Sequence, residues 1–211
     1  MARRHIKIRD VTNPTVLEAM RTVPRDRFVS ESYGDAAYGD FPLPIGYGQT
    51  ISQPSIVALM TDALGVGPGD RVLEVGTGSG YQAAVLAELG CEVFTTEIIP
   101  ELAAQAETLL RNLGYNVTVG TIDGYFGWAE HGPFDGIIVT AAVNHVPEPL
   151  IEQLAPGAAL VAPIGAVDAT QTLYRFTVDS NGDVRSEDLA AVVFVPLTGE
   201  DRRPRVHPPD L

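Results

Sequence analysis

The stretch Glu74–Gly80 (EVGTGSG) decides the fold. It completes the run Arg71–Val75, whose pattern predicts a buried strand, and it precedes Tyr81–Leu89, whose pattern predicts a helix. In an open parallel sheet ligands bind at such a strand-to-helix loop, because glycines let the backbone approach the ligand and the helix amides face it. We therefore expect a ligand site at this loop, formed by Glu74, Gly76, Thr77, Gly78, Ser79 and Gly80.

The spacing of these glycines narrows the class of ligand. A dinucleotide-binding loop has glycines at its first, third and sixth positions, but the sixth position here is Tyr81 and the last glycine has moved forward to Gly80. A phosphate-binding loop of the Gly-Lys-Ser/Thr type needs a lysine, and this loop has none. The loop therefore favours a nucleoside ligand without phosphates.

Strand and helix patterns alternate on both sides of the loop. Besides Arg71–Val75, we expect strands at Glu92–Glu97, Val117–Val119, Gly136–Thr140 and Ala159–Pro163, and helices at Gln53–Leu64, Tyr81–Leu89, Pro100–Leu113 and Glu148–Leu154. This alternation predicts an α/β fold with a doubly wound, mostly parallel sheet covered on both faces. Two further strands, Gln171–Val178 and Leu189–Val195, have no helix between them and predict an antiparallel pair at the C-terminal edge.

Two acidic residues follow the strands next to the loop. Glu97 ends the second strand 97 − 76 = 21 residues after the first glycine, where an acid accepts hydrogen bonds from ribose hydroxyls. Asp123, followed by Gly124, comes after the third strand, and its carboxylate can accept a hydrogen bond from the exocyclic amine of a base. The alternative for Glu97 is a cap on the helix near Pro100, and for Asp123 a simple turn. Taken together, the loop and both acids predict an adenosine-sized site.

The length and composition suit one domain with additions. We expect a single domain over residues 1–211: an N-terminal collar (1–50), a cofactor-binding core (51–165), terminal strands (166–199) and a flexible tail (200–211). Within the collar, Thr15–Arg21 predicts a short helix, and Phe41–Gly48, with two prolines and two glycines, predicts irregular structure.

The charge and the cysteine content exclude several classes of partner and site. The formal net charge of −13 disfavours nucleic acids and anionic membrane surfaces as partners. The lone Cys91 can form neither an intramolecular disulfide nor a thiolate zinc site, so we expect no metal. The charged start, MARRHIKIRD, does not resemble a secretory signal, and we expect a cytoplasmic protein.

Six stretches of the chain resemble the protein-L-isoaspartate O-methyltransferase family, whose members are Rossmann-like methyltransferases that use S-adenosyl-L-methionine. The matching stretches are Val23–Val29 (VPRDRFV), Leu43–Pro54 (LPIGYGQTISQP), Val72–Leu89 (VLEVGTGSGYQAAVLAEL), Phe134–Ala142 (FDGIIVTAA), Leu150–Gly157 (LIEQLAPG) and Phe194–Gly199 (FVPLTG). The resemblance implies a seven-stranded mixed sheet whose last two strands are exchanged relative to other methyltransferases.

The resemblance also implies a reaction. Members of this family transfer a methyl group to the free α-carboxylate of L-isoaspartyl residues in damaged proteins, releasing S-adenosyl-L-homocysteine, and the ester closes to a succinimide. The implied partners are isoaspartyl peptides and unfolded protein segments, and we expect a monomer. A carboxylate with a pKa of about 3.5 is already ionised at neutral pH, so the nucleophile needs no general base. None of the four histidines lies in a nucleophile motif, in agreement with this chemistry.

Site residues follow from the motif match. Ser52 occupies the position of the family's catalytic serine, and its hydroxyl is expected to orient the substrate carboxylate; the alternative is that Ser52 only caps the helix at Gln53. Substrate-binding positions implied by the match are Gln49, Thr50, Ile51, Thr140, Ala141, Ala142, Val195 and Leu197. The chain departs from the family pattern at Ile122 and Ala158, where glycine is usual, and at Ser55, where an aromatic residue is frequent.

Three other functions stay open from the sequence. The first is a methyltransferase of the same cofactor class that acts on a dedicated peptide or a small molecule. The second is a nicotinamide-dependent oxidoreductase, against which Tyr81 at the sixth loop position argues. The third is a binding module without turnover.

Overall fold

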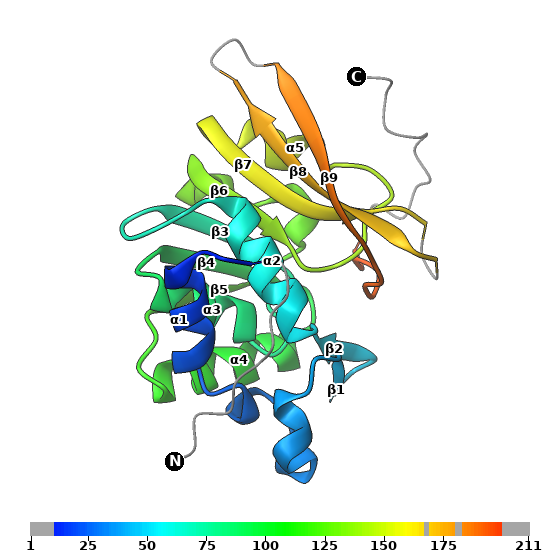
Figure 1. Cartoon of the computed structure of the whole chain (residues 1–211). Coiled ribbons are helices and arrows are strands. Elements are labelled where there is room, and N and C mark those ends of the chain that lie inside the picture. Colours follow the sequence, from blue (N-terminus) through cyan, green and yellow to red (C-terminus); the bar gives the residue numbers. More distant parts are fainter. Residues whose placement is uncertain (1–10, 167–168, 180–182, 200–211) are drawn as a thin grey trace.

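A seven-stranded mixed sheet forms the centre of the molecule, and Figure 1 shows helices on both of its faces. The computed structural model describes residues 11–166, 169–179 and 183–199. The strands are β3 (Arg71–Val75), β4 (Glu92–Glu97), β5 (Val117–Thr121), β6 (Phe134–Val139), β7 (Leu154–Ile164), β8 (Gln171–Val178) and β9 (Val184–Val192). Their order in space is β5-β4-β3-β6-β7-β8-β9. The pairs from β5 to β7 run parallel and β7-β8-β9 run antiparallel, so the expected mixed sheet is confirmed.

The helices begin and end close to where the sequence predicts. They are α1 (Pro14–Thr22), α2 (Pro54–Leu64), α3 (Tyr81–Glu88), α4 (Pro100–Asn112) and α5 (Glu148–Glu152), with short 3₁₀ segments η1 (Arg25–Phe28), η2 (Glu31–Tyr38), η3 (Gly124–Phe126) and η4 (Ala129–His131). Proline begins α1, α2 and α4, where its missing N–H is not needed. Gly65, with a left-handed φ of 72°, ends α2.

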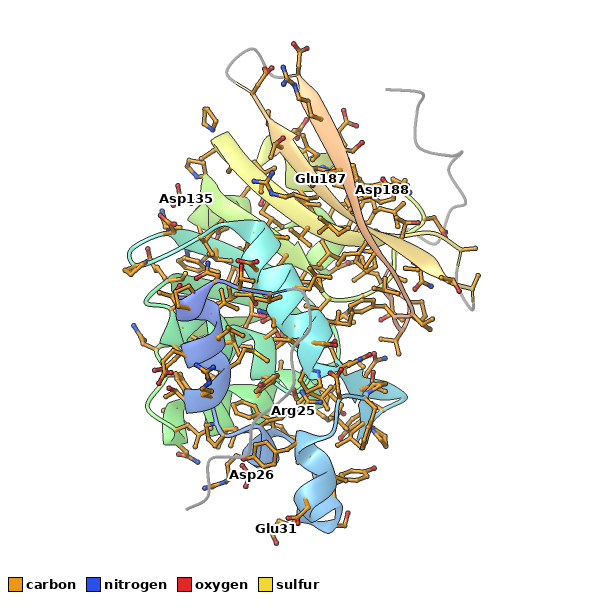
Figure 2. All side chains as sticks on the ribbon, viewed as in Figure 1. Arg25, Asp26, Glu31, Asp135, Glu187 and Asp188 are labelled. Atoms are coloured by element: carbon orange, nitrogen blue, oxygen red, sulfur yellow. The ribbon has the colours of Figure 1, made fainter. Side chains whose placement is uncertain are left out.

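Two apolar clusters cover the two faces of the sheet. Val72 and Ile138 belong to a cluster that includes residues of α1, α2 and α3. Leu73 and Ile137 point to the other face, where the cluster includes Leu150 of α5. Because both faces are covered, the central strands carry apolar side chains on both sides. The polar groups at the ends of these strands are therefore the candidates for ligand binding. The acidic side chains Asp135, Glu187 and Asp188, labelled in Figure 2, are exposed to solvent.

The prediction of irregular structure over Phe41–Gly48 is wrong for part of that segment. Leu43–Gly46 forms β1, which pairs antiparallel with β2 (Gln49–Ile51) in a separate two-stranded hairpin. Proline is tolerated because the hairpin is only two strands wide and its register shifts between Pro44 and Gly46. The turn has left-handed φ values at Gly46, Tyr47 and Gly48, which explains the glycines.

The last predicted strands also need correction. β7 starts at Leu154, five residues before the predicted Ala159, because Leu154 pairs with Phe134 before the register shifts. β9 spans Val184–Val192 and not Leu189–Val195. The polar residues at the start of β9 predict a loop between two strands, but an edge strand tolerates polar residues on its exposed face. After Val192 the chain leaves β8.

Some sequence expectations lie outside the described residues. These are the charged start MARRHIKIRD and the tail from Glu200. Among the described residues, no helix combines the length and the hydropathy needed to cross a bilayer. In the same part of the chain, no three His, Cys, Asp or Glu side chains gather in a way that could hold a metal ion.

Candidate functional site

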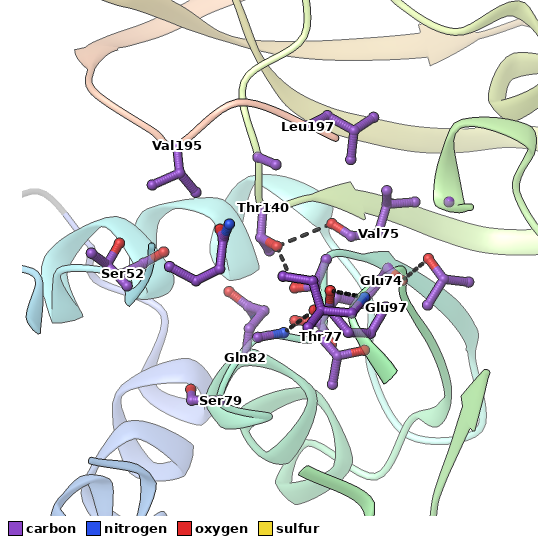
Figure 3. Close-up of a pocket in the computed structure, with 18 of the residues that line it drawn as sticks. Ser52, Glu74, Val75, Thr77, Ser79, Gln82, Glu97, Thr140, Val195 and Leu197 are labelled. Carbon is purple, nitrogen blue, oxygen red and sulfur yellow. Dashed lines mark hydrogen bonds between the residues drawn. The ribbon is translucent and has the colours of Figure 1, made fainter. Parts of the chain in front are cut away.

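A cleft of about 730 Å³, counted with the solvent at its mouth, opens at the carboxyl ends of β3, β4 and β6. Its walls come from the glycine loop, from the ends of these strands, from the segment that joins β2 to α2, and from the segment after β9 (Figure 3). The predicted site residues that line it are Gln49, Thr50, Ile51, Ser52, Glu74, Gly76, Thr77, Gly78, Ser79, Glu97, Gly124, Thr140, Ala141, Val195 and Leu197. Its position at the carboxyl ends of parallel strands is where open α/β sheets bind their ligands.

The glycine loop is fixed by backbone hydrogen bonds on one side and by a threonine on the other. The amides of Gly76 and Thr77 both donate to the carbonyl of Thr96, at 2.9 and 3.0 Å. The hydroxyl of Thr140 donates to the carbonyl of Gly76 at 2.6 Å and approaches that of Val75 at 3.0 Å. Gly76 has a φ of 98°, and a Cβ atom there would lie 2.6 Å from Thr140 Oγ1. Only glycine therefore fits this position without displacement of Thr140.

Glu97 joins the loop to the start of α4. Its Oε2 accepts a hydrogen bond from the amide of Gly78 at 2.8 Å, and its Oε1 accepts one from the amide of Ile99 at 3.0 Å. Ile99 is the N-cap residue of α4 and no side chain caps this helix, so Glu97 binds the amide that precedes α4 and does not cap the helix itself. Each carboxylate oxygen has more than one lone pair, so Glu97 can also accept hydrogen bonds from a ligand in the cleft that it lines.

Glu74 lies below the glycine loop with no exposed surface. Its Oε2 accepts a hydrogen bond from Thr95 Oγ1 at 2.6 Å, and the Thr95 hydroxyl lies 2.7 Å from that of Thr77. Burial raises the pKa of Glu74 to about 8, and the nearby charge of Glu97 acts in the same direction. Without a cation beside it, Glu74 is mostly protonated at neutral pH, whereas a positively charged ligand group next to Oε1 would lower this pKa and favour the carboxylate, which accepts hydrogen bonds.

Two buried oxygen atoms of residues that line the cleft have no hydrogen-bond partner among the residues that the structure describes. They are Oε1 of Glu74 and Oε1 of Gln82. The side-chain amide of Gln82 donates to Thr61 Oγ1 at 2.9 Å, and this hydroxyl donates to the carbonyl of Val57, which fixes the orientation of the glutamine. Buried acceptors without a partner are uncommon in folded proteins. They indicate that the cleft takes a ligand that carries hydrogen-bond donors or positive charge.

Ser52 does not cap α2. The N-cap residue of this helix is Gln53, which makes no side-chain capping bond, and Asp40 from the collar accepts the amide hydrogen of Ser55 at 2.9 Å instead. Within the described part of the chain, the Ser52 hydroxyl makes no hydrogen bond. Figure 3 shows Ser52 across the cleft from the glycine loop, with Val195 above it. Its hydroxyl is free for a ligand.

Three predicted site residues do not line the cleft. Gly80 faces α4, where a Cβ atom would meet Leu110 at 3.3 Å. Ala142 lies behind the cleft wall, where its amide donates to the carbonyl of Val195 and its carbonyl accepts from the amide of Leu197, both at 2.8 Å. Asp123 accepts the amide hydrogen of Tyr125 at 3.0 Å, and Gly199 packs against its carboxylate.

Sequence reasoning missed several residues that line the cleft: Val57, Val75, Tyr81, Gln82, Thr96, Ile98, Ile99, Pro196 and Thr198. Most of them are sequence neighbours of predicted residues, so adjacency to the motifs was the available signal. Gln82 is the residue of this set that the sequence could have predicted. It lies in the first turn of the helix that follows the glycine loop, and a side chain there can face the same side as the loop. The two histidines among the described residues lie elsewhere: His131 stacks on Phe94, and His145 Nε2 lies 2.9 Å from the Tyr125 hydroxyl.

Comparisons with known proteins show the family of the chain. The model of the family "Protein-L-isoaspartate(D-aspartate) O-methyltransferase (PCMT)" matches residues 1–202. A protein-L-isoaspartate O-methyltransferase of Gloeobacter violaceus is 51% identical over 208 residues, which cover 98% of this chain and all of the relative. A protein-L-isoaspartate O-methyltransferase 2 of Nitrosococcus oceani is 56% identical over 190 residues, which cover 90% of this chain and 86% of the relative.

A solved structure extends the similarity to three dimensions. It is a protein-L-isoaspartate O-methyltransferase from Plasmodium falciparum in complex with S-adenosyl-L-homocysteine, superimposed with a TM-score of 0.75 at 28% identity. The match covers 89% of this chain and 92% of that chain. Fold, cleft and family match lead to one conclusion: the chain belongs to the protein-L-isoaspartate(D-aspartate) O-methyltransferase family, whose cofactor is S-adenosyl-L-methionine.

Proposed function

We propose that this chain methylates the free α-carboxylate of L-isoaspartyl residues (EC 2.1.1.77), with the cofactor against the glycine loop and Glu97 and the acceptor beside Ser52. The observation that carries the assignment of residues is the single cleft that joins the unpaired acceptors of Glu74 and Gln82 to the free hydroxyl of Ser52. One continuous space is what a direct transfer between two ligands needs.

The cofactor half of the cleft fits S-adenosylmethionine through its acceptors. Glu97 would accept hydrogen bonds from the ribose hydroxyls, and the unpaired oxygens of Glu74 and Gln82 would face the cationic amino-acid part. Gly124 borders the cleft, and Asp123 is proposed to accept from the adenine amine, which requires Gly199 to give way. When bound, the cofactor supplies an electrophilic methyl group on a sulfonium.

The acceptor half orients the substrate. The Ser52 hydroxyl would donate a hydrogen bond to one oxygen of the α-carboxylate, and Gln49, Thr50, Ile51, Thr140, Ala141, Val195 and Leu197 would surround it, with Ala142 supporting them from behind. An α-carboxylate is ionised at neutral pH, so no residue needs to remove a proton. Catalysis then rests on alignment of two ligands, an effect that can supply about 7–11 kcal/mol of the barrier.

We also propose that the protein acts as a monomer in the cytoplasm, on isoaspartyl peptides and unfolded protein segments. Cys91, the one cysteine of the sequence, is a free thiol, which agrees with a reducing compartment. Light scattering coupled to size exclusion would test the monomer.

The test uses radiolabelled S-adenosylmethionine and two peptides that differ only in an isoaspartyl or an aspartyl residue. We expect base-labile methyl transfer to the isoaspartyl peptide alone. Ser52→Ala should lower kcat by about 10–100-fold, or about 1.5–3 kcal/mol, because one charge-assisted hydrogen bond is lost. Binding of S-adenosylhomocysteine should not change.

Ser55→Ala is the matched control, since Ser55 is the next serine along the chain and lies outside the cleft lining. Its bond to Asp40 uses the backbone amide, which the substitution retains. Equal methylation of both peptides would contradict the proposed substrate. Full activity of Ser52→Ala would contradict the role of Ser52.

A further inference from the structure

A second groove continues from the acceptor half of the cleft. It has a volume of about 980 Å³, counted with the open solvent above it, and shares Thr50, Ser52, Thr140 and Val195 with the cleft. Its other lining residues are Pro42, Gln53, Ile56, Thr170, Ala191, Val192, Val193 and Phe194. The groove therefore starts at Ser52 and runs outward between the start of α2 and the segment that follows β9.

The lining of this groove carries no formal charge among the described residues. On a chain with a net charge of −13, an uncharged surface of this extent is a distinct chemical environment. Somewhat more than half of its lining is apolar, with contributions from Pro42, Ile56, Val193 and Phe194. Val193 is 76% exposed, the largest fraction among the exposed large hydrophobic residues described. Exposed apolar surface beside a site indicates a binding surface.

The outer wall of the groove is held in place from both sides. The amide of Phe194 donates to Gln171 Oε1 at 2.9 Å, and Gln171 is itself 1% exposed. One residue further, the carbonyl of Val195 accepts the amide hydrogen of Ala142 at 2.8 Å. Val193 therefore presents its side chain from a fixed backbone, although β9 has already ended. A fixed wall can discriminate between side chains, because it does not move away from a poor fit.

The position of the groove next to Ser52 indicates which part of a peptide substrate it binds. A peptide whose isoaspartyl carboxylate lies at Ser52 must leave the cleft with its neighbouring residues, and an extended chain advances about 3.3 Å per residue. The side chain next to the isoaspartyl residue then lies within reach of the groove, which begins at Ser52 itself.

We propose that this groove binds the side chain of the residue next to the isoaspartyl residue and selects uncharged, apolar side chains there, an inference that rests on the proposed function. Ile56, Val193 and Phe194 are the specificity-determining residues. A charged side chain in the groove would lose water without gaining a counter-ion, because the described lining offers none. The preference suits unfolded segments, which expose apolar residues.

The experiment measures kcat/KM for isoaspartyl peptides that carry Leu, Ser, Asp or Lys at one flanking position, with both flanks examined in turn. At the flank that occupies the groove, we expect Leu to exceed Asp and Lys by about tenfold. Val193→Asp should lower kcat/KM for the Leu peptide and raise it for the Lys peptide, each by about five- to tenfold. Val193→Lys should lower kcat/KM for the Leu peptide and raise it for the Asp peptide, each by about five- to tenfold.

Ser186→Asp is the matched control, since it adds the same charge to an exposed position on β9 outside the groove. It should leave the order of the peptides unchanged. Unchanged binding of S-adenosylhomocysteine verifies that each variant is folded. If the wild type methylates all peptides equally, or if the Val193 variants leave the order unchanged at both flanks, the groove inference is overturned. Absence of methylation of every isoaspartyl peptide would instead contradict the proposed function.

Discussion

The two halves of the cleft differ in how far hydrogen bonds within the protein hold the groups that line them, although Oε1 of Glu74 and Oε1 of Gln82 stay unpaired in the cofactor half. In the cofactor half, both oxygens of Glu97 accept backbone amides, and Thr140 donates to the glycine loop. In the acceptor half, the side chains of Gln49, Thr50 and Ser52 make no hydrogen bond within the described part of the chain. One half is rigidly organised, and the other is left open.

The difference follows the ligands. The cofactor is always the same molecule, so a fixed set of acceptors avoids reorganisation at each binding event. The peptide acceptor varies from one damaged site to the next, so free hydroxyl and amide groups can adapt to it. The sequence reflects this division: the cofactor half comes mainly from residues 74–99, whereas the acceptor half joins segments near 50, 140 and 195.

Gly76→Ala gives the largest expected effect and should act on the cofactor half alone. The new Cβ would lie 2.6 Å from Thr140 Oγ1, at a φ of 98° that disfavours alanine. The loop must move, and we expect affinity for S-adenosylhomocysteine to fall about a thousandfold, or about 4 kcal/mol. Isothermal titration calorimetry measures this change.

Gly157→Ala separates the local clash from backbone strain. Gly157 has a similar φ of 84°, but a Cβ atom there would meet nothing within 4 Å, and it lies outside the cleft lining. We expect this variant to lose about 1 kcal/mol of stability and to keep its cofactor affinity. If Gly76→Ala and Gly157→Ala lost equal cofactor affinity, the clash at position 76 would not explain the loss. The arrangement of the glycine loop would then not be what organises the cofactor half.

Glu74→Gln tests whether the cofactor half lowers the stability of the protein. The folded protein holds the proton of Glu74 with a pKa of about 8, above the ordinary value of 4.5, so this group stabilises the fold below pH 4.5 and loses that contribution as the pH rises toward 8. Between pH 6 and pH 8 the wild type should lose about 2 kcal/mol relative to Glu74→Gln, which does not titrate.

Urea unfolding of both proteins at pH 6 and pH 8 measures this difference, and all other titrations cancel in the comparison. Thr95 can still donate to the carbonyl oxygen of a glutamine at position 74, so its hydrogen bond gives no reason for a pH-dependent difference. If the two unfolding free energies change in parallel, Glu74 is ionised in the folded state already at pH 6.

The sequence predicts the cofactor half far better than the acceptor half. The strand, loop and helix around Glu74–Gly80 follow from local pattern, and Glu97 follows from its distance to the first glycine, because parallel strands bring their ends to one edge. Ser52, Thr140 and Val195 come from three remote segments, and only resemblance to a family suggested that they meet. Their contact depends on the sheet order and on the departure of the chain from β8 after Val192.

The N-terminal collar shows why the remainder was missed. Its β1-β2 hairpin is short and contains proline, so no periodic pattern in the sequence predicts it. Arg25 is fully buried there, with its Nε donating to the carbonyl of Ala37 at 2.8 Å and its guanidinium 4.9 Å from the ring of Tyr81. A buried arginine held by aromatic and backbone contacts has no signature in a single sequence.

Asp40→Ala gives the smallest expected effect and tests whether the two halves are independent. Asp40 accepts the amide hydrogen of Ser55 and so supplies the cap that Gln53 does not provide to α2. Loss of this cap should lower the free energy of unfolding by about 1 kcal/mol. Because Ser52 immediately precedes Gln53, we also expect kcat/KM to fall about fivefold. Cofactor affinity should be unchanged. Asp40→Asn retains an acceptor oxygen but removes the charge near Arg25, so it should recover most of the activity. A parallel fall in cofactor affinity would mean that the collar organises both halves, and the division between them would fail.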